Sequence, residues 1–398
     1  MEGDFIKINS QLRPLSWLYG MGVGFRNMLF ETGFLKSQSY SIPVISVGNI
    51  TVGGTGKTPH VEYLIRLLKD KMKVAVLSRG YKRKSHGFVL ADEQTPMEAL
   101  GDEPYQMKQK FPEVTVAVDK KRTRGILHLT EDQDTPNIDV ILLDDAFQHR
   151  YVKPGINILL VDYHRLIIYD ELLPSGRLRE PVKSKNRADI VIITKCPKNL
   201  KPMEFRVITK AMNLYPYQQL YFSTYDYDTP RLVFPDCQEP AEMPSNIESL
   251  KGKHILLLTG IASPEQMKLD LEPYVTSILP LVFADHHHFK RKDIERINQA
   301  FEDLPQPGLI ITTEKDATRL KQTEGLSDEV KKHLIVLPIR VSLLLDQEEA
   351  FNQNIIGYVR KNSRNSILVK GKDENKSKNS DRAGNRPRTI SFRNNRNL

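Results

Sequence analysis

Short continuous runs of apolar residues alternate along this chain with longer stretches in which apolar residues recur at helical spacing. A continuous apolar run of roughly four to eight residues is typical of a strand buried on both faces, as in a parallel sheet. The alternation of such runs with helical stretches predicts a parallel sheet with helices on both faces. In the first half of the chain we expect strands at 42–47, 73–78, 114–118, 138–144, 156–161 and 189–194, and helices at 59–70, 102–111 and 120–130.

A second, smaller set of elements follows an extended aromatic stretch at 220–234, which we interpret as a crossing point between domains. In this set we expect strands at 254–259, 277–283, 309–313 and 334–338, and helices at 263–271 and 292–302. We therefore divide the chain into an N-terminal helix region at 1–40, a core domain at 41–220, a smaller α/β domain with flanking linker strands at 221–345, an amphipathic helix at 346–365 that returns to the core, and a basic tail at 366–398.

A glycine-rich segment connects the first predicted strand to the first predicted helix. Glycines at positions 53, 54 and 56 allow a tight turn whose amide groups can surround phosphate oxygens. Lys57 would reach the β and γ phosphates, and Thr58 would hold Mg²⁺. The strict phosphate-loop pattern has a glycine where this chain has Thr51, so the loop is a variant. The sequence predicts an α/β fold of the P-loop NTPase type that binds ATP or GTP through Thr51, Val52, Gly53, Gly54, Thr55, Gly56, Lys57 and Thr58.

Two acidic segments follow the loop along the chain. The predicted strand at 138–144 ends in Asp144 and Asp145, the form of a strand that delivers a carboxylate to the Mg²⁺ of a bound nucleotide. Asp102 and Glu103 open the predicted helix at 102–111. Asp102 is suited to cap that helix, but it would also lie at the ligand-binding edge of the sheet, where a kinase needs a base. Both interpretations of Asp102 stay open at this point.

Two further polar segments follow predicted strands. The segment 283–289 contains three successive histidines, which point in different directions and do not readily share one metal ion. We interpret it as one functional histidine oriented by Asp285 and facing the first domain, or as a solvated loop. The basic segment 79–84 would suit an anionic substrate, and a solvated run of charges is the alternative.

The segment 14–25 is uncharged and mostly apolar, with Arg13 and Arg26 at its borders. It is well short of the roughly 20 residues that a membrane-spanning helix needs. A helix that continues to Phe34, with Trp17 and Tyr19 near one end, would suit the membrane interface. Docking on its own domain is the alternative, and glycines at 20, 22 and 24 weaken the helical pattern.

Composition and charge limit the kinds of partner that the protein is expected to bind. The 398 residues predict two or three domains, and the two cysteines, Cys196 and Cys237, have no metal-ligand spacing and fit a reducing compartment. The net charge is +9, of which residues 370–398 hold +6, with nine Lys and Arg against three acidic residues. The remaining +3 argues against a large nucleic-acid footprint, and the tail is expected to be disordered.

Together these segments resemble one family, the tetraacyldisaccharide 4′-kinases of lipid A biosynthesis. The similar segments occur in the family's order across about residues 12–345. They are the loop at 46–59, Ser-Arg-Gly-Tyr at 78–81, Gly-Asp-Glu-Pro at 101–104, Asp-Asp-Ala-Phe-Gln-His at 144–149, Leu-Arg-Glu-Pro at 178–181, Phe-Ala-Asp-His at 283–286 and Thr-Glu-Lys-Asp-Ala at 313–317.

The resemblance implies transfer of the ATP γ-phosphate to the 4′-hydroxyl of a tetraacyldisaccharide 1-phosphate. This reaction gives the bis-phosphorylated lipid IV-A at the cytoplasmic face of the inner membrane, where we expect a peripheral, monomeric enzyme with no specific nucleic-acid partner. The expected residues are Asp102 as catalytic base with His286 as its partner and Lys57 on the phosphates, Thr58, Glu103, Asp144 and Asp145 around Mg²⁺, and Arg79, Tyr81, Gln148 and Arg179 as candidates for binding the substrate.

Two other classes of function are compatible with parts of the sequence. A regulatory or chaperone-type NTPase would use the same loop and hydrolyse nucleotide without a lipid acceptor. A non-enzymatic adaptor for nucleic acid or membrane would depend on the tail and the N-terminal helix. Phosphoryl transfer to a panel of acylated disaccharide phosphates would separate these functions from the lipid kinase.

Overall fold

The computed structural model describes residues 6, 8–132, 135, 137–237, 243–261, 264–285 and 287–363. Within them the larger sheet has nine strands in the order β14-β8-β7-β6-β1-β5-β2-β4-β3. Their bounds are β1 Val44–Gly48, β2 Val74–Ser78, β3 Val89–Leu90, β4 Thr115–Val118, β5 Val140–Asp144, β6 Ile156–Asp162, β7 Ile190–Thr194, β8 Gln219–Tyr227 and β14 Ile339–Leu343.

The larger sheet is parallel from β8 to β4, and only its two edge strands run the other way. β14 pairs with β8 and β3 pairs with β4 in antiparallel fashion. Every residue of β1, β2, β5 and β7 is buried. Strands covered on both faces cannot alternate apolar and polar residues, which explains the continuous apolar runs of the sequence.

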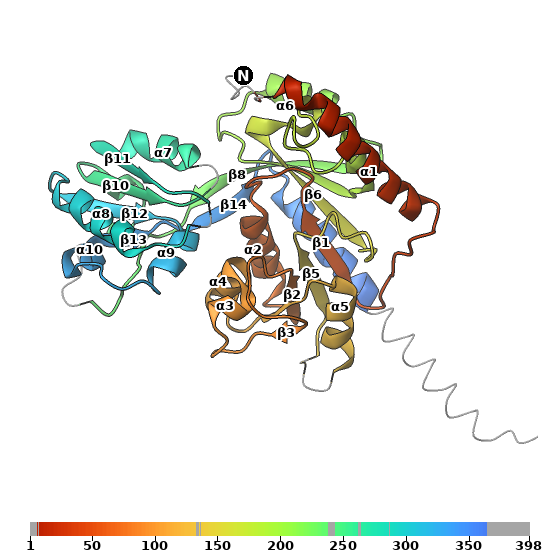
Figure 1. Ribbon diagram of the computed structural model, residues 1–398, viewed down its shortest axis with the longest axis horizontal. Coiled ribbons are helices and arrows are strands. Elements are labelled where there is room, and N and C mark those ends of the chain that lie inside the picture. The colour runs from red at the N-terminus through yellow and green to blue at the C-terminus, as the bar shows by residue number, and fades with distance from the viewer. Residues whose placement is uncertain are drawn as a thin grey trace, which may run out of the picture.

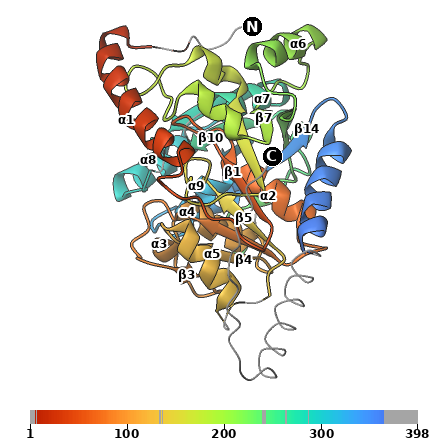
Figure 2. The same cartoon turned by 90° about the vertical axis from the view of Figure 1, so that its right-hand side faces the viewer.

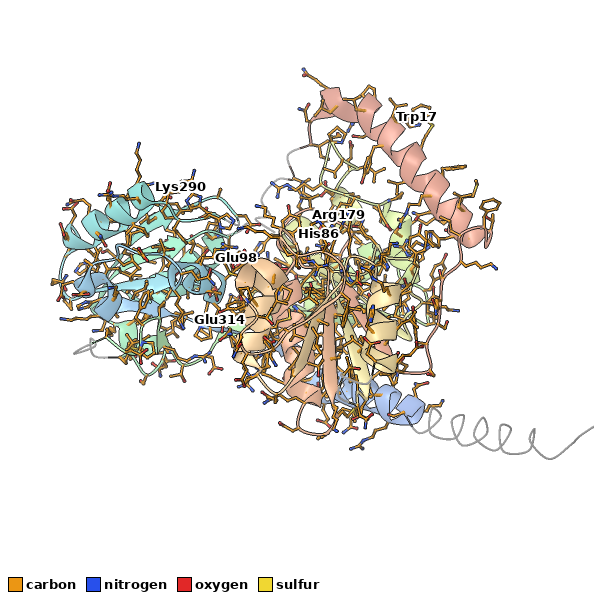
Figure 3. All side chains as sticks on the ribbon, turned by 60° about the horizontal axis from the view of Figure 1, so that its bottom comes forward. Trp17, His86, Glu98, Arg179, Lys290 and Glu314 are labelled. Atoms are coloured by element: carbon orange, nitrogen blue, oxygen red, sulfur yellow. The ribbon has the colours of Figure 1, made fainter. Side chains whose placement is uncertain are left out.

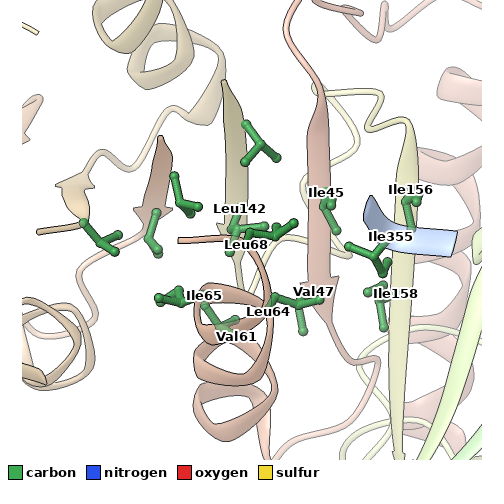
Figure 4. Close-up of a cluster of buried hydrophobic side chains, with 14 of the residues drawn as sticks. Ile45, Val47, Val61, Leu64, Ile65, Leu68, Leu142, Ile156, Ile158 and Ile355 are labelled. Atoms are coloured by element: carbon green, nitrogen blue, oxygen red, sulfur yellow. The ribbon is translucent and has the colours of Figure 1, made fainter. Parts of the chain in front are cut away.

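Helices cover both faces of the larger sheet. On one face lie α2 (Lys57–Leu68), α4 (Asp102–Lys110) and a final helix at 348–363, and on the other lie α5 (Arg122–Glu131) and α6 (Pro202–Met212). Figure 4 shows Leu64 and Leu68 of α2 packed among side chains of β1 and β5. Each fully buried side chain of this size stabilises the fold by roughly 1.5–3 kcal/mol. The predicted α/β fold with a mostly parallel sheet is confirmed.

A second, smaller sheet lies to one side of the first (Figure 1). Its five strands in the described residues follow the order β11-β10-β12-β13-β9. Their bounds are β9 Arg231–Leu232, β10 His254–Thr259, β11 Ser277–Val282, β12 Gly308–Thr312 and β13 Leu334–Val336, with helices α7 Glu265–Leu271, α8 Arg291–Glu302, α9 Glu314–Leu320 and α10 Asp328–His333. We call these elements, residues 231–336, the small-sheet region, and the rest of the described chain the large-sheet region.

β8 and β14 connect the two regions. The chain leaves the large sheet at the end of β8 and returns along β14, its antiparallel neighbour. The helix at 348–363 then packs against the large-sheet core through Phe351, Ile355 and Val359. The whole small-sheet region is thus inserted in the sequence between two strands that pair with each other.

The N-terminal helix α1 (Arg13–Glu31) forms in spite of its three glycines. Its more polar side faces the protein, where Tyr19 donates a hydrogen bond to the Arg179 carbonyl at 2.9 Å and Asn27 and Phe30 are buried. Its exposed side is apolar and includes Trp17, which is 67% exposed, and Phe25. Figures 2 and 3 show α1 along the outside of the large-sheet region, with Trp17 on its outer surface. In the described part of the chain, no helix combines the length and the apolar character needed to cross a bilayer.

Candidate functional site

The phosphate loop occupies the end of β1, and α2 begins two residues earlier than predicted, at Lys57. Gly56 has a φ of 80° and Gly53 a φ of 118°, conformations that favour glycine. A Cβ on Gly56 would also lie 2.1 Å from the Tyr225 hydroxyl. The local sequence therefore folds as a loop that leads directly into the N-terminus of a helix, where amide groups are available to an anion.

The loop is held from a neighbouring segment and from β7. The Val52 amide donates to the Arg177 carbonyl at 2.8 Å, and Thr51 bridges to Leu178. The Thr194 hydroxyl at the end of β7 donates to the Thr55 carbonyl at 3.1 Å. These bonds fix the loop backbone without using its side chains.

Lys57 and the two aspartates at the end of β5 meet beneath the loop. Lys57 Nζ lies 3.6 Å and Arg179 Nη2 lies 3.5 Å from Asp145 Oδ1. Arg179 also donates to the Asn49 side chain. The structure thus brings together Lys57, Asp145 and Arg179 from three separate predicted segments.

Asp144 and Asp145 differ in environment although they are adjacent. Burial, reinforced by repulsion from Glu103 and Asp145, raises the pKa of Asp144 to about 7. Its Oδ2 accepts a hydrogen bond from Ser78 at 3.0 Å, whereas its buried Oδ1 has no partner among the described residues. For Asp145, burial opposes ionisation, but Lys57 and Arg179 hold its pKa below the usual range.

Asp102 and Glu103 begin α4 and both form ion pairs with the small-sheet region. Arg319 Nη2 lies 2.6 Å from Asp102 Oδ2, and Lys315 Nζ lies 2.9 Å from Glu103 Oε1. Both cations belong to α9. His286, the predicted partner of Asp102, lies outside the described residues.

A cavity opens between the loop and the small-sheet region. Its described lining includes Gly54 to Thr58 of the loop and helix start, Glu103 of α4, the strand residues Tyr225 and Tyr227, and Ile261, Met267, Asp285 and Lys315 of the small-sheet region. Polar groups from the loop and Glu103 from α4 therefore face apolar and aromatic side chains across one space, which is the usual character of a small-molecule site.

The four candidates for binding the substrate, Arg79, Tyr81, Gln148 and Arg179, have different surroundings. Tyr81 is 60% exposed, and the Gln148 carbonyl accepts a hydrogen bond from Arg26 of α1 at 3.3 Å. Arg79 is near enough to the buried Arg122 to lower its pKa, as a secondary contribution after burial. Arg179, the fourth candidate, contacts Asp145.

Several residues near the site were not predicted from the sequence. Arg122 is buried and donates to the Asp144 carbonyl at 3.0 Å, and Lys195 Nζ lies 2.6 Å from Asp162 and donates to the Gly54 carbonyl. Lys315 and Arg319 lie on α9, which begins directly after the strand predicted at 309–313. That position after a strand end was a signal that could have found Lys315, but nothing local marks Arg319.

Comparison with known proteins identifies the family. The model of the tetraacyldisaccharide-1-P 4′-kinase family matches residues 8–360. The chain is 58% identical over 367 residues to the tetraacyldisaccharide 4′-kinase of Phocaeicola vulgatus, covering 92% of this chain and 99% of that protein. It is 55% identical to that of Bacteroides thetaiotaomicron, covering 92% and 97%. The chain belongs to the tetraacyldisaccharide 4′-kinase family.

A solved structure supports the same family. The chain resembles the crystal structure of LpxK from Aquifex aeolicus in complex with ATP, with a TM-score of 0.65 and 30% sequence identity over 88% of this chain and 98% of that one. Members of the tetraacyldisaccharide 4′-kinase family are the ATP-dependent kinases of the lipid A pathway, so the chain is a phosphotransferase. The match spans every described element from α1 to the final helix and excludes the tail.

Proposed function

We propose that this protein transfers the γ-phosphate of ATP to the 4′-hydroxyl of tetraacyldisaccharide 1-phosphate and so forms lipid IV-A. The observation that carries the proposal is the meeting of Lys57 with Asp145 at the end of the loop, beside a cavity that Glu103 also lines. The names of the relatives and the ATP complex of the Aquifex aeolicus protein support the choice of both substrates.

ATP binds in this proposal with its phosphates on the loop and its base in the cavity between the regions. The amides of residues 51–56 and the N-terminus of α2 attract the phosphate oxygens, and Lys57 neutralises charge that develops during transfer. Catalysis of phosphoryl transfer depends mainly on such positioning and charge neutralisation.

Mg²⁺ is the second expected cofactor, and the residues present fit it. The buried, unpartnered Asp144 Oδ1 is an oxygen ligand of the kind that Mg²⁺ prefers. We assign the ion to Thr58 and Asp144, with Glu103 and Asp145 beside it, where it would neutralise phosphate charge.

Asp102 serves as the base that accepts the proton of the 4′-hydroxyl, with His286 as its partner. Arg79, Tyr81, Gln148 and Arg179 bind the disaccharide phosphate. Two of these four residues touch α1, since Tyr19 donates to the Arg179 carbonyl and Arg26 to the Gln148 carbonyl. The lipid would therefore approach along α1, whose apolar surface faces outward.

The protein acts as a peripheral monomer at the cytoplasmic face of the inner membrane in this proposal. The exposed apolar side of α1 would lie in the interface, where aromatic side chains such as Trp17 are favoured. The polar inner side of the same helix keeps it attached to the large-sheet region. Docking on the protein and contact with the membrane are thus compatible.

The proposal is tested by incubating the protein with γ-labelled ATP and a panel of acylated disaccharide phosphates, with products separated by chromatography. We expect label in a bis-phosphorylated lipid when the acceptor has a free 4′-hydroxyl, and none when that position is blocked. Release of labelled phosphate with no labelled lipid would instead show a hydrolytic NTPase and overturn the proposal.

A further inference from the structure

Arg319 joins the small-sheet region to the predicted base. Its side chain is 2% exposed, and its Nε and Nη2 donate to Asp102 Oδ2 at 3.1 and 2.6 Å. Its Nη1 donates to Asp316 Oδ1 at 3.0 Å and to the Gly260 carbonyl at 3.4 Å. One buried guanidinium thus binds acceptors on both sides of the junction between the two regions.

The small-sheet side of this arrangement is itself fixed. Asp316 is fully buried and accepts hydrogen bonds from the Gly260 amide at 2.8 Å and the Thr313 hydroxyl at 2.7 Å. The planar guanidinium has few rotational choices once Asp316 and Gly260 hold one edge. The edge that faces Asp102 is therefore placed by the small-sheet region.

Two more ion pairs join the same two helices. Lys315 pairs with Glu103 at 2.9 Å, and Lys110 of α4 pairs with Glu314 of α9 at 2.6 Å. Figure 1 shows α9 beside α3 and α4, and Figure 3 places Glu314 at the junction of the two regions. α9 thus contacts both acids that open α4.

We infer that Arg319 is a positioning residue for phosphoryl transfer, holding the Asp102 carboxylate in place from across the junction. The inference rests on the proposed role of Asp102 as base. A carboxylate on the first turn of a short helix can rotate, and two donors on its Oδ2, from a guanidinium that is itself held in place, restrict that rotation. Because a displacement of about 1 Å at a reacting group can lower a rate by about 10²-fold, such a restraint has a measurable effect on kcat.

The test compares Arg319→Gln and Arg319→Lys with a matched control, Arg231→Gln. Arg231 also forms an ion pair with α9, to Glu314 at 3.6 Å within the small-sheet region, but it is 58% exposed and contacts neither Asp102 nor Glu103 in the described structure. We expect Arg319→Gln to lower kcat about 10- to 100-fold while the KM for ATP stays within about threefold. Arg319→Lys should be intermediate because an ammonium keeps the charge but not the fork geometry. Arg231→Gln should stay within about twofold of the parent.

Loss of folding must be separated from loss of positioning. Removing a buried cation takes from the buried Asp316 carboxylate its ion pair with Arg319, so circular dichroism melts and binding of a fluorescent ATP analogue accompany each kinetic measurement. If Arg319→Gln does not fold, Arg319→Lys, which keeps the charge, decides the question. A kcat within twofold of the parent in a folded Arg319→Gln or Arg319→Lys protein overturns the inference.

A double-variant cycle distinguishes failure of this inference from failure of the proposed base. In an Asp102→Asn background, Arg319→Lys should change the residual kcat by less than about twofold, because the two residues act as a unit. Fully multiplicative losses would show that Arg319 acts elsewhere, which overturns the inference alone. A near-normal kcat in Asp102→Asn would reject the base assignment, and with it this role for Arg319.

Discussion

At the scale of single residues, Asp144 and Asp145 are adjacent in the sequence, but the pKa values of their carboxyl groups are shifted in opposite directions. Asp144 ends a buried strand, so its carboxylate has little solvent, and its pKa rises to about 7. Asp145 has a φ of 46°, which turns it out of the strand direction toward Lys57 and Arg179. In the proposed site, Asp144 would therefore hold the cation, and Asp145 would orient Lys57.

Lys57 is the residue whose loss should most affect the transfer step. We expect Lys57→Ala to lower phosphoryl transfer by about 10²-fold or more, because this amine offsets charge on the transferring phosphate. The measurement is the amount of labelled lipid product that each variant forms. Lys69→Ala, just beyond the other end of α2, is the control, since Lys69 pairs with Glu113 away from the loop. Turnover near the parent level in Lys57→Ala would contradict the assignment of the loop.

His60 on α2 should make the stability of the protein depend on pH. Burial lowers its pKa from 6.5 to about 4, and its ring contacts the Gly56 carbonyl and the Ser223 hydroxyl. The folded state keeps His60 neutral while the unfolded chain takes up a proton below pH 6.5. Stability is therefore lost as the pH falls from about 6.5 toward 4, by about 2 kcal/mol at pH 5.

Urea unfolding of the parent and of His60→Asn at pH 7.5 and pH 5 measures this dependence. The variant should lose about 2 kcal/mol less than the parent over that interval. His86→Asn, at an exposed position, should behave as the parent does. An identical loss in the parent and in His60→Asn would show that other groups cause the dependence.

At the scale of elements, α1 has the reverse of the usual amphipathic arrangement. Helices on soluble domains bury their apolar side, whereas α1 buries Ser16 and Asn27 beside a single large apolar residue, Phe30, and exposes Trp17, Leu18 and Phe25. An exposed apolar surface of this kind marks a site of interaction. Its polar inner side reaches Arg179 and Gln148, so the helix connects a surface suited to lipid with the site.

Serine at Trp17, Leu18 and Phe25 should release the protein from vesicles. Removal of these apolar side chains weakens interfacial binding, so we expect less protein to sediment with vesicles and a higher apparent KM for vesicle-borne acceptor. Serine at Leu279 and Val282, which are comparably exposed in the small-sheet region, is the control. Unchanged sedimentation of the α1 variant would assign the helix to a role other than membrane binding.

At the scale of the whole molecule, the two regions meet through ion pairs and a cavity rather than through a continuous apolar core. The main hydrophobic clusters of the two sheets share no residue, although Tyr227 at the end of β8 packs against the small-sheet core. Ion pairs of Asp102, Glu103 and Lys110 join α4 to α9. Interfaces of this polar type permit relative motion. The arrangement is suited to a site that closes around two substrates.

Deletion of residues 370–398 should leave activity in detergent largely intact. The family match ends at residue 360 and the last described helix at residue 363, so every assigned site residue lies before the deletion. Specific activity and the melting temperature of the truncated protein are the measurements. A folded truncated protein that has lost most of its turnover would place the tail in the enzyme.

The sequence by itself determined the class of fold and the chemistry of the loop, because both depend on local patterns. Continuous apolar runs predict buried parallel strands whatever their order, and the glycines with Lys57 and Thr58 form a loop from adjacent residues. The strand ends that deliver Asp144 and Asp145 follow the same logic. The motifs by themselves also carry the resemblance to the family.

Only the tertiary structure decided which distant residues meet. Arg319 is separated from Asp102 by 217 positions, and no local pattern marks their contact. No local pattern marks the contact of Arg179 with Asp145 either. The hydrophobic pattern along the chain likewise cannot show which side of α1 faces the protein. Ion pairs between regions depend on the packing of whole elements, and that packing is set by the sum of many small contacts rather than by any one segment.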